Sequence, residues 1–205
     1  MQFRFAPALA AGALLLACAL ASAQPMDVGG VKYPATSQVG GQTLQLNGAG
    51  MRYKFVIKVY TAGLYLPAKS GTTDGVLAQN GARRVHVVMQ REIDANEFGK
   101  MFTRGMQDNA PKDEFSKFIP GTIKLGEIFG AYKKLKAGDV FFLDYVPGQG
   151  TTVVVNGKPA SDPIKEPEFF NALLRIWIGN NPADGALKEA MLGREARPVT
   201  SPGQQ

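Results

Sequence analysis

Residues 48–67 read GAGMRYKFVIKVYTAGLYLP and combine two glycines, an arginine and a long apolar run. From residue 51 to residue 60 the odd positions are apolar, whereas Arg52, Lys54 and Lys58 occupy even positions. A period of two is typical of a strand with one buried face. The sequence therefore predicts a single strand over residues 51–60.

Arg52 and Tyr60 raise a question of distance within this predicted strand. In one straight strand they share a face but lie about 27 Å apart, at about 3.4 Å per residue. No Gly, Pro, Asn or Asp between Met51 and Thr61 marks a reversal of the chain. The sequence thus leaves two interpretations open: the two side chains converge on one site, or Arg52 caps a turn and packs on the sheet.

Helices are predicted where the apolar period changes to that of a helix. Asp94 followed three residues later by Glu97 is typical of a capping box, and the helix that it starts is expected to end near Asn109. A broken helical region follows over residues 112–136, with an interruption at Pro120-Gly121. Two more helices are predicted, over residues 166–179 and 183–192.

Strands are predicted on both sides of the first helices. Residues 43–46 and 83–93 alternate in polarity, and residues 138–159 read as a β-hairpin around a Gly-Gln-Gly turn. Strands grouped at the start and near the middle, with helices between and after them, are typical of one architecture. We expect an α+β fold with an antiparallel β-sheet and a layer of helices packed on one face.

The first 23 residues have the pattern of a secretory signal peptide. One basic residue precedes an apolar run, and Ala21-Ser22-Ala23 is a suitable cleavage site. The alternative is a lipoprotein signal, in which Cys18, the only cysteine, becomes the lipidated first residue. We expect a periplasmic or secreted protein with a polar lead at 24–39, one domain at 40–193 and a flexible tail at 194–205.

Composition excludes several functional classes. The formal net charge of +6 suits contact with an anionic membrane surface, but no basic run indicates nucleic-acid binding. His86 is the only histidine, so a catalytic or metal site that needs several histidines is excluded. No nucleotide-binding or cofactor motif occurs, so we predict no metal and no cofactor. The sequence identifies no protein partner.

Several motifs together resemble one superfamily. GAGMR at 48–52, with IKVYTAGLYLP at 57–67, resembles the chalcone isomerase fold superfamily, and three later motifs are similar to its C-terminal half: GDVFFLDYVPGQGTTVVVNGKP at 138–159, FFNALLRIWIG at 169–179 and LKEAMLG at 187–193. The resemblance covers roughly residues 40–193 and is strongest to secreted bacterial chalcone isomerase-like proteins. It implies an open-faced β-sandwich of chalcone isomerase type.

The resemblance also allows a comparison of functional positions. In plant chalcone isomerases an arginine after a Gly-x-Gly turn assists the addition of a phenolate to an enone, together with a threonine, a tyrosine, an asparagine and a late hydroxyl. Arg52 matches the arginine, and the other positions fall at Tyr60, Phe98, near Gly105 and near Ile176. A developing charge would lose most of its fixed donors with these side chains. Flavonoid isomerisation is therefore disfavoured.

The pair of Arg52 and Tyr60 is similar instead to the non-catalytic fatty-acid-binding members of the superfamily. The resemblance implies binding of a small amphipathic carboxylate such as a fatty acid, with Arg52 and Tyr60 at the carboxylate and with Phe98, Phe102 and Ile176 lining an apolar pocket. One alternative is an isomerase of the intramolecular lyase type that uses Arg52 as electrophile and Tyr60 as proton donor or acceptor. Another is an envelope protein-interaction module with a vestigial pocket.

Overall fold

The structure is a computed structural model that describes residues 25–111 and 114–194. The expected signal peptide at 1–23, including Cys18, and the tail beyond residue 194 lie outside the described residues. Within the described residues, no helix is long and apolar enough to cross a membrane.

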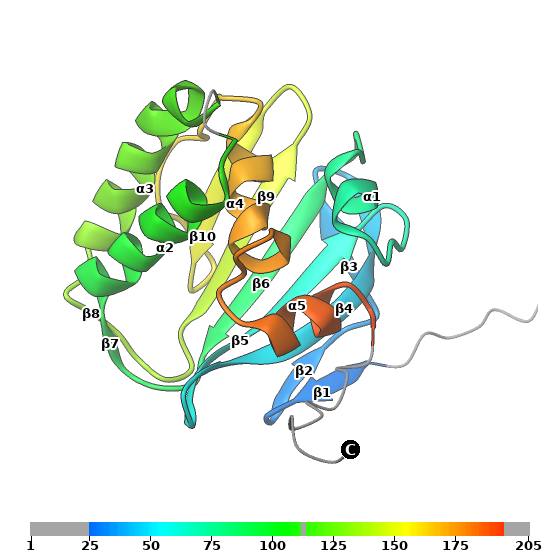
Figure 1. The fold of residues 1–205 in the computed structure, drawn as a ribbon, viewed down its shortest axis with the longest axis horizontal. Coiled ribbons are helices and arrows are strands. Elements are labelled where there is room, and N and C mark those ends of the chain that lie inside the picture. The colour runs from blue at the N-terminus through cyan, green and yellow to red at the C-terminus, as the bar shows by residue number, and fades with distance from the viewer. Residues whose placement is uncertain (1–24, 112–113, 195–205) are drawn as a thin grey trace, which may run out of the picture.

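A seven-stranded antiparallel sheet forms the centre of the molecule (Figure 1), with the strand order β11-β10-β9-β6-β5-β4-β3. Strands that follow one another in sequence are neighbours, except that β6 pairs with β9 after a helical excursion. The seven strands are β3 (Thr36–Val39), β4 (Gln42–Lys54), β5 (Ile57–Leu66), β6 (Arg83–Met89), β9 (Val140–Val146), β10 (Gly150–Val155) and β11 (Lys158–Pro159).

Helices cover one face of this sheet, as the sequence predicts (Figure 1). They are α1 (Thr73–Leu77), α2 (Ala95–Asn109), a 3-10 turn η1 (Phe115–Phe118), α3 (Ile119–Gly130), α4 (Phe169–Ile178) and α5 (Gly185–Met191). Two short pairs complete the structure: β1 (Met26–Val28) with β2 (Val31–Tyr33), and β7 (Ile93–Asp94) with β8 (Lys134–Leu135). The predicted α+β architecture is confirmed.

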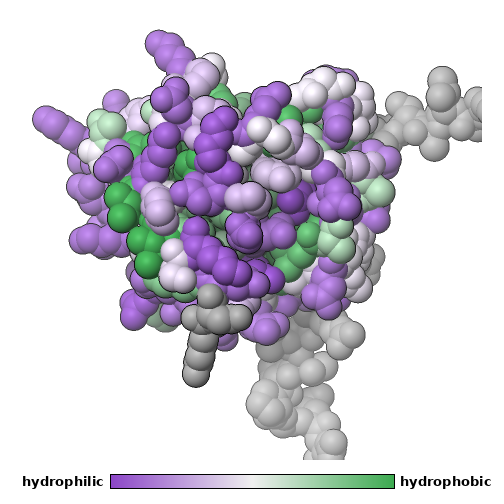
Figure 2. Space-filling view, turned by 90° about the horizontal axis from the view of Figure 1, so that it is seen from above, coloured by the Kyte–Doolittle hydropathy of each residue, from purple (hydrophilic) through white to green (hydrophobic). Residues whose placement is uncertain are grey.

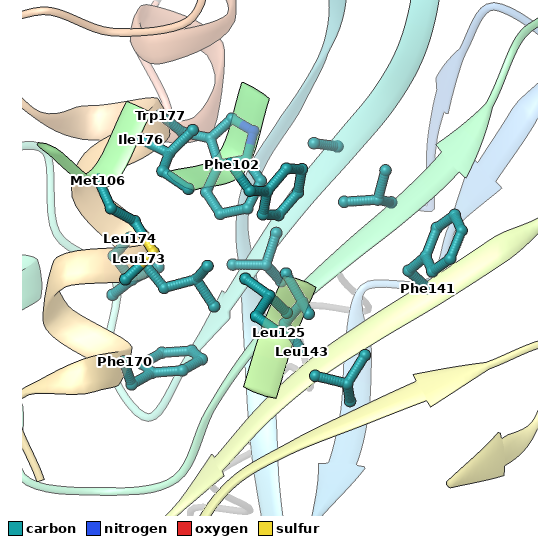
Figure 3. Close-up of a cluster of buried hydrophobic side chains, with 14 of the residues drawn as sticks. Phe102, Met106, Leu125, Phe141, Leu143, Phe170, Leu173, Leu174, Ile176 and Trp177 are labelled. Atoms are coloured by element: carbon teal, nitrogen blue, oxygen red, sulfur yellow. The ribbon is translucent and has the colours of Figure 1, made fainter. Parts of the chain in front are cut away.

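The core between sheet and helices is aromatic and aliphatic. Phe102 from α2, Leu125 from α3 and Trp177 from α4 meet Phe141 and Leu143 of β9 in one buried cluster (Figure 3). Each of these side chains is almost fully removed from water, and burial of apolar surface is the main favourable term in folding. This core fixes the helices relative to the strand ends on which the candidate site is built.

Local sequence signals predict most of the helices to within a few residues of their observed bounds. The predicted helix start and end are confirmed, because the side chain of Asp94 accepts a hydrogen bond from the backbone N–H of Glu97 at 3.0 Å and α2 ends at Asn109. Of the capping box, this is the half that forms, since the carboxylate of Glu97 accepts a hydrogen bond from Lys100 instead. The predicted interruption at Pro120-Gly121 is wrong. Pro120 lies in the first turn of α3, where its missing N–H costs the helix no internal hydrogen bond.

The predicted single strand over residues 51–60 is also wrong. The chain reverses between β4 and β5 at Phe55 and Val56, so this range contributes the ends of two paired strands. Phe55 makes the turn with a φ of 57°, a left-handed conformation that usually calls for glycine or asparagine. The alternating pattern is real, but its central apolar residues are exposed at a hairpin tip instead of buried.

The glycines of GAGMR lie within β4 and do not form the turn that the resemblance implies. Helix α5 packs directly onto this strand, and a Cβ on Gly48 would overlap the carbonyl oxygen of Ala190. A Cβ on Gly50 would lie 2.7 Å from the Cβ of Ala190. The two glycines therefore serve the close approach of a helix to the sheet.

Gly48→Ala is expected to lower the free energy of unfolding by about 1–3 kcal/mol, because the new methyl group meets rigid backbone rather than a movable side chain. Urea denaturation followed by circular dichroism measures this loss. Gly126→Ala in α3 is the matched control, since its Cβ would enter open space and alanine favours helices by about 1 kcal/mol. Equal stability changes in the two variants would contradict the packing role of Gly48.

On the sheet face opposite α4, His86 is held between aromatic rings. The imidazole centroid lies 4.9 Å from the ring of Tyr33 and 4.6 Å from that of Phe142. Burial, with a smaller contribution from the positive charge of Arg84, lowers the pKa of His86 from 6.5 to about 4. This histidine is a neutral packing residue in the folded protein.

The lowered pKa of His86 predicts an acid-sensitive stability. Between pH 6.5 and about 4 the unfolded chain binds a proton that the folded chain does not. The free energy of unfolding should therefore fall as the pH decreases through this window, by at most about 1.4 kcal/mol per pH unit from this group. Urea denaturation of the wild type and of His86→Gln at several pH values tests this. An identical pH dependence in both proteins would contradict it.

Candidate functional site

The reversal at the hairpin tip brings Arg52 and Tyr60 together. The two residues are direct cross-strand partners of β4 and β5, and the register then shifts so that Tyr53 pairs with Lys58. This shift leaves Val59 as the extra residue of a β-bulge. The guanidinium carbon of Arg52 lies 5.3 Å from the ring centroid of Tyr60, in place of the long separation of a straight strand.

Asp184 holds the strand beside Arg52 in place. One carboxylate oxygen accepts a hydrogen bond from the backbone N–H of Tyr53 at 2.9 Å. The other accepts from the backbone N–H of Leu187, also at 2.9 Å, and caps α5. Both oxygens thus have backbone partners, and no ion pair joins this acid to Arg52 within the described chain.

Tyr60 is fully buried and hydrogen-bonded on one side. The indole Nε1 of Trp177 donates to its hydroxyl oxygen at 2.9 Å. Burial raises the pKa of Tyr60, although the positive charge of Arg52 and the hydrogen bond from Trp177 act in the opposite direction. The phenol is therefore neutral at physiological pH. Its oxygen accepts the indole hydrogen bond, so its own hydrogen is left to donate.

The guanidinium of Arg52 is partly buried and has few hydrogen-bond partners. Its Nε is buried without a hydrogen-bond partner, and its Nη1 contacts the Sδ of Met101 at 3.7 Å. Arg84 shows the usual arrangement in the same protein, since it makes two 2.6 Å hydrogen bonds to the carboxylate of Asp144. A buried polar atom without a partner costs stability, and the Nε of Arg52 shares this feature with the Nε of Arg83. Arg52 differs from Arg83 in lining a pocket, so its Nε is a candidate donor to an anion.

A small pocket of about 170 Å³ adjoins Arg52. Its lining combines apolar side chains with two cations besides Arg52. The lining residues are Arg52, Lys54, Ile57, Val59, Arg91, Ile93 and Met101. Apolar walls with a few placed polar groups are typical of small-molecule sites. The residues come from the β4–β5 hairpin, from the segment after β6 and from α2.

Two larger hollows lie elsewhere and lack these features. One of about 410 Å³ runs along α2 beside Gly126 of α3 and is lined by polar and charged residues and by glycines. Another of about 340 Å³ lies between α1 and the end of α4 and is lined by asparagines, aspartates and Arg175. Neither includes Arg52, so size alone does not identify the site. Tyr60 lies buried behind Arg52 and lines none of the three pockets.

Phe98, Phe102 and Ile176, which the resemblance implies as pocket residues, lie deeper in the core than Tyr60. The ring of Phe98 meets Tyr60 edge-on with centroids 6.0 Å apart, and Phe102 lies 4.8 Å from Phe98. Ile176 of α4 packs against α2, where a Cβ on Gly105 would lie 3.1 Å from its Cγ2. All three nominated side chains are buried in the core, and none lines the 170 Å³ pocket.

Sequence reasoning missed most of the pocket wall. Arg91 and Ile93 lie in a segment that only the tertiary fold brings beside the hairpin, and no local signal marks them. Met101 occurs in the sequence at the apolar spacing of a helix, which is typical of core residues, and Lys54 occupies an even position of the predicted strand. Trp177, the only tryptophan, also lies in an apolar helical pattern, which gives no sign of its hydrogen bond to Tyr60. The described residues contain no cluster of three or more potential metal ligands.

Comparisons with known proteins agree with this architecture. The fold is similar to the crystal structure of a fatty-acid binding protein from Arabidopsis thaliana, with a TM-score of 0.60 and 15% sequence identity. The match covers 80% of this chain and 92% of that one. Nothing matches among curated protein sequences. The chalcone isomerase-like family matches residues 25–193, which include the strands β1 to β3, and the chain belongs to this family.

Proposed function

We propose that this protein binds a small amphipathic carboxylate, with a fatty acid as the first candidate. The observation that carries the proposal is the half-buried guanidinium of Arg52, whose buried Nε has no hydrogen-bond partner, at the wall of a pocket and beside the ring of Tyr60. A carboxylate supplies the acceptors that both groups lack, and an alkyl chain suits the apolar wall.

The chemistry of recognition follows from the two side chains. A guanidinium gives a carboxylate two parallel hydrogen bonds. The hydroxyl hydrogen of Tyr60, which lies behind the pocket lining, adds a third when the carboxylate reaches past Arg52. Lys54 and Arg91 at the pocket wall add positive potential. A volume of about 170 Å³ holds about five or six groups of the size of a water molecule, which take about 30 Å³ each. The pocket suits a carboxylate with the first carbons of its chain.

The proposal is one of binding without turnover. Phe98 and Ile176 carry no hydrogen-bonding side-chain group, and Gly105 has no side chain, so a developing oxyanion finds few donors at these positions. The raised pKa of Tyr60 keeps the phenol protonated, which suits a donor and not a general base. The fatty-acid binding named for the structurally similar plant protein supports this choice of ligand class.

We also propose that the protein is exported from the cytoplasm. The pattern of residues 1–23 supports export across the inner membrane, with cleavage after Ala23 or, in the alternative, lipidation at Cys18. An exported binding protein would meet amphipathic anions from envelope lipids. Intact mass and N-terminal sequencing of the exported protein distinguish a chain that begins at Gln24 from a lipidated chain that begins at Cys18.

Native mass spectrometry of the exported protein tests the proposal without an assumption about the ligand. We expect a bound small molecule that denaturation releases and that is identified as a carboxylic acid with an alkyl chain. Arg52→Ala should carry none, whereas Arg104→Ala, which removes an exposed arginine of α2, should carry as much as the wild type. Equal occupancy in Arg52→Ala, or an empty wild type, would contradict the proposal.

Affinity for a defined ligand measures the contribution of the charge. Arg52→Ala should weaken decanoate binding about 10- to 100-fold, or about 1.5–3 kcal/mol, because hydrogen bonds to a charged group are lost. The decanoate affinity of Arg52→Lys should lie between those of the wild type and Arg52→Ala, since lysine keeps the charge but not the planar fork of hydrogen-bond donors. Isothermal titration calorimetry gives these values. Decanol, which lacks the charge, should bind the wild type about as weakly as decanoate binds Arg52→Ala.

Tyr60→Phe separates the phenol from the guanidinium. The substitution leaves the indole N–H of Trp177 without its acceptor, so the free energy of unfolding should fall by about 1–3 kcal/mol. Decanoate affinity should fall by less than in Arg52→Ala, because a neutral hydrogen bond is worth less than a charge-assisted one. A larger loss of affinity in Tyr60→Phe than in Arg52→Ala would contradict Arg52 as the anchor.

A further inference from the structure

The tip of the β4–β5 hairpin exposes an unusual run of apolar side chains. Phe55 is 92% exposed and Val56 89%, and the flanking Tyr53 and Ile57 are also exposed. Single exposed apolar residues are common, but contiguous ones mark interaction sites. The hairpin tip lies at the lower edge of the molecule in Figure 1, level with the β1–β2 pair, and Figure 2 shows the opposite end, which is largely hydrophilic with apolar areas between.

The backbone of the tip is also unfavourable for these residues. Phe55 adopts a φ of 57°, where a side chain with a Cβ is disfavoured and glycine or asparagine is usual. Among the described residues, the most exposed aromatic ring thus lies at a position where a small polar residue would suit both the turn and the solvent. Such an outlier points to a function for the side chain.

Cations surround the apolar tip. Lys54 and Lys58 flank it in sequence, and Arg91 reaches the same pocket wall as Lys54. All three are exposed, and none forms an ion pair within the described part of the chain. No acidic residue occurs from Arg52 to Lys58. A tip with this charge repels a second copy of itself and attracts an anionic surface.

From these observations we propose that the hairpin tip docks on an anionic phospholipid bilayer. Phe55 and Val56 enter the boundary between headgroups and acyl chains, and Lys54, Lys58 and Arg91 bind lipid phosphates. A short apolar insertion together with a basic patch is the combination that gives reversible membrane binding. Insertion of the apolar tip and binding of lipid phosphates are each too weak for stable binding alone, so docking depends on both.

Docking in this orientation sets the position of the pocket. Ile57 belongs both to the exposed hairpin and to the wall of the 170 Å³ pocket, as does Lys54. The pocket therefore opens at the bilayer surface when the tip is inserted. Amphipathic anions gather at this depth of a membrane, so the docked protein would collect or release them there.

Co-sedimentation with vesicles tests the docking. The purified protein should bind vesicles of phosphatidylethanolamine and phosphatidylglycerol and should bind pure phosphatidylcholine at least about tenfold more weakly. Phe55→Asp should reduce binding to the anionic vesicles about tenfold or more. Lys58→Glu should reduce it as well, and high salt should weaken binding of the wild type. Phe55→Trp should shift its emission to shorter wavelength on addition of anionic vesicles.

Ile123→Asp is the matched control, because Ile123 is an exposed apolar residue of α3 at 58% exposure and lies outside the hairpin. It should bind vesicles as the wild type does. Equal losses in Ile123→Asp and Phe55→Asp, no loss in Phe55→Asp, or equal binding to phosphatidylcholine would overturn the proposal. A dimer that sediments as such and dissociates in Phe55→Asp would assign the tip to a second copy instead. Decanoate binding is measured without vesicles, so either proposal can fail alone.

Discussion

The antiparallel pairing of β4 with β5 is the constraint on which the site depends. The reversal at Phe55 sets Arg52 opposite Tyr60, and the bulge at Val59 then shifts the register toward the tip. A slip of one residue would send every side chain of a strand to the other sheet face. Helix α5 secures this register from outside, because Asp184 binds the backbone of β4 and caps the helix at once.

Three arginines that are buried or half-buried have different sets of interaction partners. Arg84 is paired with Asp144, and Arg83 lies between two aromatic rings with a 2.7 Å hydrogen bond to Asn171. Arg52 has the ring of Tyr60 and a thioether sulfur but no carboxylate partner among the described residues, and the Nε atoms of both Arg52 and Arg83 lack a hydrogen-bond partner. A cation is costly to bury, so the proposed carboxylate ligand would gain most from binding at Arg52.

Local sequence signals predicted what local interactions determine. The capping box at Asp94 and the Gly-Gln-Gly hairpin gave elements close to those observed, and the layered α+β arrangement followed from their order. The turn at Phe55 escaped prediction because it uses a residue that rarely adopts a positive φ. Arg91 and Ile93 of the pocket escaped it because their proximity to the hairpin is a tertiary effect. The pairing of Arg52 with Tyr60 needed the turn first.

The Nε–H of Arg52 is the most direct reporter of the central claim, which is that this guanidinium anchors a carboxylate. Its resonance in a proton–nitrogen correlation spectrum can be assigned with Arg52→Lys and followed during titration with decanoate. The account predicts a downfield shift that saturates at one equivalent, while the Nε–H of Arg84, already bound to Asp144, stays in place. Saturable decanoate binding that leaves the Arg52 resonance unmoved would contradict the account.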